Sequence, residues 1–313
     1  MDWIGRVTYS MVSKPFFLLR SEIDTARWDA TVEHAAQRKI YAFSWYLDTV
    51  ADDWCALVSE DYSTIMPLPC SAKSSMNHVY TPPYCQQFGV FSQNEVSAEA
   101  LASFINSIPQ RFRHVDLNLN ESNLDLNESD LDVPNGLEIH RNRNLVLQLN
   151  KPANLIAQSF TRNHKRNIRK ACRAGLIYDV ADDAEKVIEI FESGRGRTLG
   201  DYSDMDHSLF RVLLRELQQR GKATILIANS ADGDTVAGAV FFMSHDGAYF
   251  IFSGTSESGK KLSAMHGLIG HFLESHSAGL AFLDFEGSHL DDLARFYAGF
   301  GADEALFVRI VRT

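Results

Sequence analysis

The chain has 313 residues, of which 45% are hydrophobic and 11% aromatic. These proportions are sufficient for packed cores and exclude a generally disordered chain, and the length predicts two domains of about 150 residues each. The formal net charge is −10, so no long-range positive field draws the molecule to nucleic acid or anionic lipid, and any anion site has to be local.

Signals for export, membrane insertion and metal binding are missing from the sequence. The opening MDWIGRVTYSMVSKPFFLLR lacks the uninterrupted apolar segment of a signal peptide, and no window reaches the roughly 18 apolar residues of a membrane span. We therefore expect a cytoplasmic protein. No CxxC pair occurs among the cysteines, which favours reduced thiols over a disulfide framework or a zinc site.

In chain order, the first half mixes short strands with few long helices. Two strands are predicted on either side of an acidic turn, at Ala56–Ser59 and Ser63–Leu68. The apolar spacing of Ala98–Ile108 predicts an amphipathic helix that ends at Pro109, and alternation predicts a strand at His114–Leu119.

A tandem duplication follows, LNESNLD and LNESDLD, covering Leu119–Asp132. Its leucine spacing would suit a partner-binding helix, but its Asn, Ser and Asp residues favour turns, so a lengthened surface loop is the simpler interpretation. A strand at Arg143–Leu149 then ends at Asn150-Lys151-Pro152. We place the domain boundary there, giving an N-terminal domain of residues 1–150 and a C-terminal domain of residues 151–313.

The second half has a more regular order. Helices are predicted at Asn154–Ala174, Asp182–Ser193, His207–Arg220, Lys261–His276 and Leu290–Phe300. Strands are predicted at Leu176–Val180, Ala223–Asn229, Val236–Ser244, Ala248–Thr255, Ala281–Phe285 and Ala305–Val311. From the first of these strands onward, the order is β-α-α-β-β-β-α-β-α-β.

This order and three motifs resemble the GNAT acyltransferase fold, and more closely its FemAB-related branch, whose members carry two such domains in tandem. The motifs are RNHKRNIRKACRAG at Arg162–Gly175, LDFEGS at Leu283–Ser288 and ARFYAGFGA at Ala294–Ala302. The resemblance implies an α/β fold of the α+β mixed-sheet type, with two tandem GNAT-like domains that each contain a central, mostly antiparallel sheet flanked by helices. The first would be degenerate, and the last strand could pack with it.

The basic stretch RNHKRNIRKACR places Arg162, Arg166, Arg169 and Arg173 at spacings of 4, 3 and 4, on one face of a helix. Like charges at these spacings repel each other, and no acid occurs between Lys165 and Tyr178, so an anion is the expected complement. The alternative is a structural ion-pair network with acids such as those of the Asp116–Asp132 loop.

Arginine suits phosphate because its planar fork donates two hydrogen bonds at once. In the peptidoglycan-building relatives, basic residues of this region meet the diphosphate of a UDP-linked sugar peptide. The resemblance transfers that role to Arg166 and Arg169, and we add Lys165 and Arg162 as candidate substrate-binding residues.

The reaction centre is expected where two strands separate. In GNAT folds the parallel strands before and after the long helix splay apart around the acyl donor, and by analogy these are Ala248–Thr255 and Ala281–Phe285. Glu286 is the first candidate general base and Asp284 the second, although either could instead cap a helix or bind backbone amides. Tyr297 resembles the tyrosine with which many GNAT enzymes protonate a departing thiolate, and packing is its alternative role.

Further candidate substrate contacts lie around this centre. Ser288 follows the strand, Arg295 lies on the next helix, and Lys260 and Lys261 end a Gly254–Lys261 loop that could hold a phosphate or carboxylate. That loop departs from the acyl-CoA pattern Q/R-x-x-G-x-G/A, and an ordinary turn is its alternative interpretation. Three histidines at five-residue intervals in the following helix spread around it, so no metal site is predicted.

These features predict a cytoplasmic acyl- or aminoacyltransferase that moves an acyl group from an activated donor to an amine or hydroxyl acceptor bound between the domains. Acyl-CoA or aminoacyl-tRNA would be a donor substrate rather than a tightly bound cofactor. The acceptor would be a small molecule or nucleotide-sugar, and the net charge disfavours nucleic acid other than tRNA. The alternative is a noncatalytic tandem-GNAT module that binds a nucleotide-sugar or another phosphate ligand.

Overall fold

The computed structural model describes residues 14–71, 78–124, 127, 136–194, 207–286 and 290–313. Its contacts define two compact units, residues 1–141 with 307–313, and residues 142–306. The division falls inside two long strands, β7 (Glu138–Gln148) and β13 (Asp303–Arg312). The predicted boundary at residue 150 lies just beyond the end of β7, and the last strand groups with the first unit from Phe307 onward.

The first unit contains a sheet in the order β1-β2-β3-β4-β6-β13, with β5 paired to β3. Its pairs are antiparallel except β4 with β6, which are parallel. The strands are β1 (Phe16–Leu19), β2 (Asp53–Val58), β3 (Thr64–Ser71), β4 (His78–Tyr80), β5 (Phe91–Ser92) and β6 (His114–Asn118). The helices are α1 (Thr25–His34), α2 (Ser44–Val50) and α3 (Ala98–Asn106), with short 3-10 turns η1 (Arg20–Glu22), η2 (Ile40–Ala42) and η3 (Glu121–Asn123).

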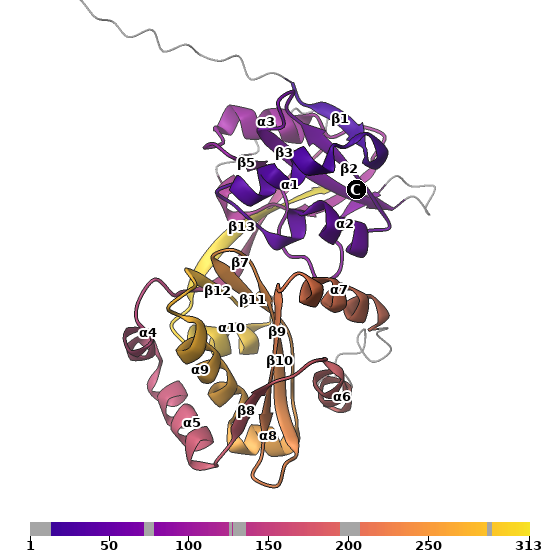
Figure 1. Ribbon diagram of the computed structural model, residues 1–313. Helices are drawn as coiled ribbons and strands as arrows, with labels where there is room; N and C mark the ends of the chain where they lie inside the picture. The colour runs from indigo at the N-terminus through magenta and orange to yellow at the C-terminus, as the bar shows by residue number, and fades with distance from the viewer. Residues whose placement is uncertain (1–13, 72–77, 125–126, 128–135, 195–206, 287–289) are drawn as a thin grey trace, which may run out of the picture. The chain divides into compact units, whose positions relative to one another are not determined.

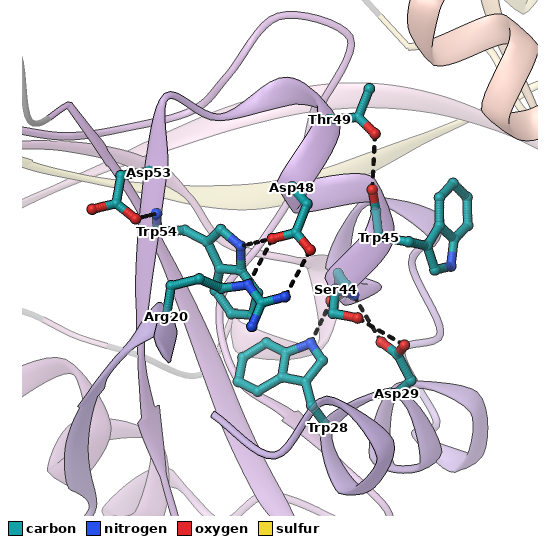
Figure 2. A network of polar contacts seen from close by, with 10 residues as sticks. Arg20, Trp28, Asp29, Ser44, Trp45, Asp48, Thr49, Asp53 and Trp54 are labelled. Carbon is teal, nitrogen blue, oxygen red and sulfur yellow. Dashed lines mark hydrogen bonds and ion pairs between the residues drawn. The ribbon is translucent and has the colours of Figure 1, made fainter. Parts of the chain in front are cut away.

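Two tryptophans form the centre of the first unit's core. Trp28 and Trp54 are buried, with ring centroids 5.1 Å apart. Both indole N–H groups are satisfied, because Trp28 donates to the Ala42 carbonyl and Trp54 to the Asp48 carboxylate, each at 2.8 Å. Asp48 also accepts two hydrogen bonds from Arg20 (Figure 2). Asp48 therefore accepts from both Arg20 and Trp54, and we interpret this network as structural.

The second unit contains a sheet in the order β7-β12-β11-β10-β9-β8. In the described part of the unit, β11 and β12 pair in parallel, and the other neighbouring strands in this order pair antiparallel. The strands are β8 (Ile177–Val180), β9 (Ala223–Asn229), β10 (Thr235–Met243), β11 (Gly247–Thr255) and β12 (Phe282–Asp284). The helices are α4 (Ala153–Ser159), α5 (Arg162–Arg173), α6 (Glu185–Ser193), α7 (Ser208–Gln219), α8 (Glu257–Leu262), α9 (Ala264–His276) and α10 (Asp291–Ala298).

Helices cover both faces of this second sheet (Figure 1). On one face Phe241 of β10 stacks on Phe272 of α9, with ring centroids 3.8 Å apart. On the other face, the ring centroid of Phe252 of β11 lies 4.9 Å from the ring centroids of both Phe191 of α6 and Phe210 of α7. The predicted fold class, a mixed α/β sheet flanked by helices, is confirmed.

Two predicted helices are each divided in the structure. The helix predicted at Asn154–Ala174 is α4 followed by α5, because Phe160 is buried against Phe300 and the Thr161 side chain caps α5 in an extended backbone. The helix predicted at Lys261–His276 is divided between α8 and α9 by Ser263, whose φ of 60° is left-handed. Both single-helix predictions were therefore wrong at one interior position.

Candidate functional site

The parallel pair β11 and β12 separates soon after it forms. Three residues of each strand are in register, ending at Tyr249 opposite Asp284. β12 stops there, whereas β11 continues to Thr255, paired on its other side with β10. Within the described residues, β11 therefore has no strand partner on the β12 side from Phe250 to Thr255. Backbone groups on that side are available for hydrogen bonds to a ligand.

The two predicted carboxylates lie at this separation, in different environments. Asp284 is 1% exposed and accepts hydrogen bonds from Asn144 Nδ2 at 2.7 Å and from the Glu286 backbone N–H at 3.0 Å. It therefore holds β7 and the residues that follow β12. Glu286 is partly exposed, and its φ of 41° lies in the left-handed region, where a residue with a side chain is strained. Ser288 lies outside the described residues.

Tyr297 of α10 lies beside the same separation. Its ring stacks on Phe285 at a centroid distance of 4.5 Å and meets Phe250 edge-on at 5.9 Å. These phenylalanines directly follow Asp284 and Tyr249, the last paired residues of the two strands. The structure thus places Tyr297 close to Asp284 and to the residue that precedes Glu286. The order of these residues in the sequence could not establish this proximity.

The basic helix α5 is fastened to the end of α10. The Thr161 N–H donates to the Gly299 carbonyl at 2.9 Å, and Nε2 of buried His164 lies 2.8 Å from the Phe296 carbonyl. A carbonyl oxygen can only accept, so Nε2 carries a proton. On its inner side α5 packs against α9, where a Cβ on Gly267 would lie 2.7 Å from the Cβ of Ala171. The absence of a side chain at Gly267 permits this close approach.

The six cations of α5 form no ion pair with any acid in the described ranges. Arg166 donates to Asn163 Oδ1 at 2.7 Å and Lys165 to the Gln158 carbonyl at 2.8 Å, and both acceptors are neutral. The exposed cations are Arg162, Arg166, Arg169, Lys170 and Arg173. The acids considered as alternative partners include Asp116, which instead accepts two hydrogen bonds from Arg309 at 2.6 Å.

Two of the three remaining candidate cations form ion pairs with nearby acids. Lys260 pairs with Glu257 at 2.5 Å, and Arg295 pairs with Asp292. Lys261 is exposed. The segment that we considered as a phosphate loop is already helical from Glu257, and its Gly259 N–H donates to the Ser256 hydroxyl.

Two histidines meet between α5, α9 and α10, which sequence reasoning missed. The rings of His164 and His266 are 4.7 Å apart, and Phe296 and Phe300 surround them. Burial, followed by the neighbouring His164, lowers the pKa of His266 to about 4, and burial also lowers the pKa of His164. Both rings are therefore neutral near pH 7. The described residues contain no group of three or more metal-ligating side chains.

A cavity of about 550 Å³ lies between α4, α5 and α9. Lys165 and Arg169 line this cavity, whereas Arg162 and Arg166 do not. The cations of α5 therefore divide into a group at the cavity and a group outside it. No sequence motif marked this cavity, because its walls form only when the chain is divided into α4 and α5 before Arg162.

Comparison with known proteins assigns the part of the chain that contains these features. Residues 158–292 match the model described as an acetyltransferase (GNAT) domain. This segment is similar to GNAT acetyltransferase domains. The match contains α5, β11 and β12, whose arrangement had been predicted by resemblance. An acyltransferase is thus the class of enzyme to which the GNAT domain points. The search of curated proteins found no significant match.

Solved structures resemble the chain over both of its units. FemX matches with a TM-score of 0.69 and 12% identity, covering 91% of this chain and 96% of FemX. The C-terminal domain of a putative lysylphosphatidylglycerol synthetase from Agrobacterium fabrum matches with a TM-score of 0.58 and 11% identity, over 94% of this chain and 93% of the other. A tandem GNAT protein from the clavulanic acid biosynthesis pathway matches with a TM-score of 0.52 and 11% identity, over 95% and 97%.

At these identities the similarity establishes the fold. It confirms the predicted resemblance to FemAB-related, tandem GNAT proteins, and the GNAT domain gives the reaction class. No helix in the described ranges combines the length and apolar character needed to cross a membrane.

Proposed function

We propose that the chain transfers an acyl group from an activated donor to an amine or hydroxyl acceptor at the separation of β11 and β12. The observation that carries this proposal is the register of the two strands, which ends at Tyr249 and Asp284 while β11 continues to Thr255. An activated acyl group bound along β11 could accept hydrogen bonds from its unpaired edge. The donor is a thioester such as acyl-CoA or an ester such as aminoacyl-tRNA.

In the proposed reaction, the acceptor nitrogen or oxygen attacks the acyl carbonyl carbon and forms the new bond to it. Glu286 takes the proton that the acceptor loses. The bond from the carbonyl carbon to the donor's sulfur or oxygen breaks, and the leaving group takes a proton from the Tyr297 hydroxyl or from water. Asp284 acts as a positioning residue, because it accepts the Glu286 backbone N–H. Much of the rate enhancement comes from holding the reactants in place.

We further propose that α5 holds a phosphate of the donor or acceptor. Its exposed arginines repel one another and are not neutralised by any acid in the described part of the chain. Arg162 and Arg166 lie one turn apart outside the α4–α5–α9 cavity, so their guanidinium groups could bind adjacent oxygens of a diphosphate.

A binding module without turnover is the competing function. Two observations favour it: Asp284 is occupied by Asn144 and by a backbone amide, and Tyr297 packs between aromatic rings. A binding module would show no acyl transfer even in the wild type. Replacing Glu286 should then leave the ligand affinity unchanged.

The deciding experiment measures free thiol released from acetyl-CoA, and deacylation of an aminoacyl-tRNA, with a panel of amines. We expect Glu286→Gln to lower turnover by about 10²- to 10⁴-fold, the usual contribution of a general base. The control Glu304→Gln removes an exposed carboxylate from β13 and should keep wild-type turnover. Full turnover in Glu286→Gln would refute the assignment of the base, and no acyl transfer by the wild type to any acceptor would favour the binding module.

The phosphate proposal is tested with inorganic pyrophosphate as the probe. Pyrophosphate should raise the melting temperature of the wild type, and Arg162→Ala with Arg166→Ala should abolish this increase. The control Lys186→Ala with Arg215→Ala removes the same charge from α6 and α7 and should behave as the wild type. Equal stabilisation of both double variants would refute the role of α5. Arg169 is left intact because it also lines the cavity.

A further inference from the structure

The α4–α5–α9 cavity has three walls, each made by one face of a helix. Within each helix, most of the lining positions are three or four residues apart and therefore share a side. The lining residues are Ala153, Asn154, Ala157 and Gln158 of α4, Lys165, Ile168 and Arg169 of α5, Gly270, Leu273 and Glu274 of α9, and Phe160. Phe160 belongs to the link before α5. The volume of about 550 Å³ lies in the range of small-molecule sites.

Much of this lining is apolar, and it is firmly held. Phe160 and Leu273 are buried members of the second unit's core, and Ile168 packs against that core. Lys165 is fixed across the cavity wall, because its ammonium donates to the Gln158 carbonyl at the end of α4. The hydrophobic effect therefore favours a ligand with an apolar group that covers this surface.

Opposite charges face the cavity from two different helices without neutralising each other. Arg169 comes from α5 and Glu274 from α9, and the described residues include no ion-pair partner for either one. Both side chains are exposed to solvent. A ligand that carries both a carboxylate and an ammonium could pair with each of them at once.

We propose that this cavity binds a zwitterionic compound with a large apolar side chain, such as an apolar amino acid or dipeptide. The ligand carboxylate pairs with Arg169, its ammonium pairs with Glu274, and its side chains cover Ile168 and Leu273. A simple hydrocarbon would leave both charges unused, and a simple anion would meet the Glu274 carboxylate. The acyl-transfer chemistry is not needed for this inference, which stands on the cavity alone.

The experiment uses the dipeptide Leu-Phe, its N-acetyl derivative and its C-terminal amide, with affinities measured by calorimetry on the full chain. Leu-Phe should bind about tenfold or more tightly than either derivative, because a charge-assisted hydrogen bond contributes a factor of this order. Arg169→Gln should weaken Leu-Phe by about tenfold but leave the amide unchanged. Glu274→Gln should weaken Leu-Phe similarly but leave the N-acetyl derivative unchanged.

Matched controls separate these contacts from general charge effects and from misfolding. Arg173→Gln removes an exposed arginine from the same helix outside the cavity, and should bind Leu-Phe as the wild type does. Ala157→Leu fills part of the cavity and should weaken all three ligands, with a thermal melt to confirm that it folds. Absence of saturable Leu-Phe binding to the wild type, or equal affinity for the three ligands, would overturn the proposal whatever the outcome for acyl transfer.

Discussion

Acidification should destabilise the second unit through the histidine pair of α5 and α9. His164 donates from Nε2 to the Phe296 carbonyl, and Thr161 Oγ1 lies 3.0 Å from its Nδ1, which suits a neutral ring that accepts from the hydroxyl. His266 lies 4.7 Å away between centroids, with Asn167 Nδ2 3.2 Å from its Nε2. Protonating both rings would place two positive charges together in an aromatic pocket.

The magnitude follows from the lowered pKa of His266, about 4 compared with an ordinary 6.5. Below pH 6.5 the His266 ring takes up a proton in the unfolded chain, whereas in the folded chain it does so only near pH 4. The contribution of the neutral ring to the free energy of unfolding is therefore present near pH 7 and is lost as the pH falls from about 6.5 to 4. The full difference corresponds to at most about 3 kcal/mol. Because the ring is partly exposed and screened by solvent, we expect about 1 kcal/mol of this loss between about pH 7 and 5.

Urea unfolding at a series of pH values measures this loss. His266→Gln removes the titrating ring, and its free energy of unfolding should fall less than that of the wild type between about pH 7 and 5, by about 1 kcal/mol. His245→Gln changes an exposed histidine in a turn and should follow the wild type. If the wild type and His266→Gln lose stability in parallel, the buried pair is not the source of the acid sensitivity.

Two further substitutions test the packing around the proposed centre. Asp284→Ala removes the acceptor for Asn144 Nδ2 and the Glu286 N–H, and should lower the free energy of unfolding in urea by about 2–4 kcal/mol; a loss below about 1 kcal/mol would mean that water replaces the carboxylate. Gly259→Ala would place a Cβ 2.1 Å from the Val236 carbonyl oxygen, so we expect a loss of about 1–3 kcal/mol with a lower melting temperature, whereas an unchanged melting temperature would show that α8 shifts freely.

Most strands of the second unit could be predicted because local chemistry determines them. The turn Ala231-Asp232-Gly233-Asp234 separates two apolar runs, and the structure pairs these runs as β9 and β10. In the first unit, the predicted strands around Glu60-Asp61 likewise pair as β2 and β3, each extended by a few residues. Alternation and turn residues are local, so one sequence contains enough information to find them.

The helix breaks and the site depend on contacts that are distant in sequence. Thr161 could have been read as a cap, but Phe160 continues the apolar pattern, and its burial against Phe300 is what separates α4 from α5. Asp284 and Glu286 alternate in sequence, yet it is Asp284 that accepts a hydrogen bond from Asn144, 140 residues earlier. Whether a carboxylate is structural or available for chemistry is therefore set by its tertiary neighbours.

The joint between α5 and α10 connects the two parts of the proposed function. His164 and Thr161 hold the start of the basic helix to the end of the helix that carries Tyr297, through the carbonyls of Phe296 and Gly299. An anion that orders the arginines of α5 would therefore act on a helix already joined to the proposed reaction centre. Replacing His164 by Gln, which retains a side-chain donor, should preserve pyrophosphate binding better than replacement by Ala. Equal binding by both variants would show that α5 binds its anion independently of this joint.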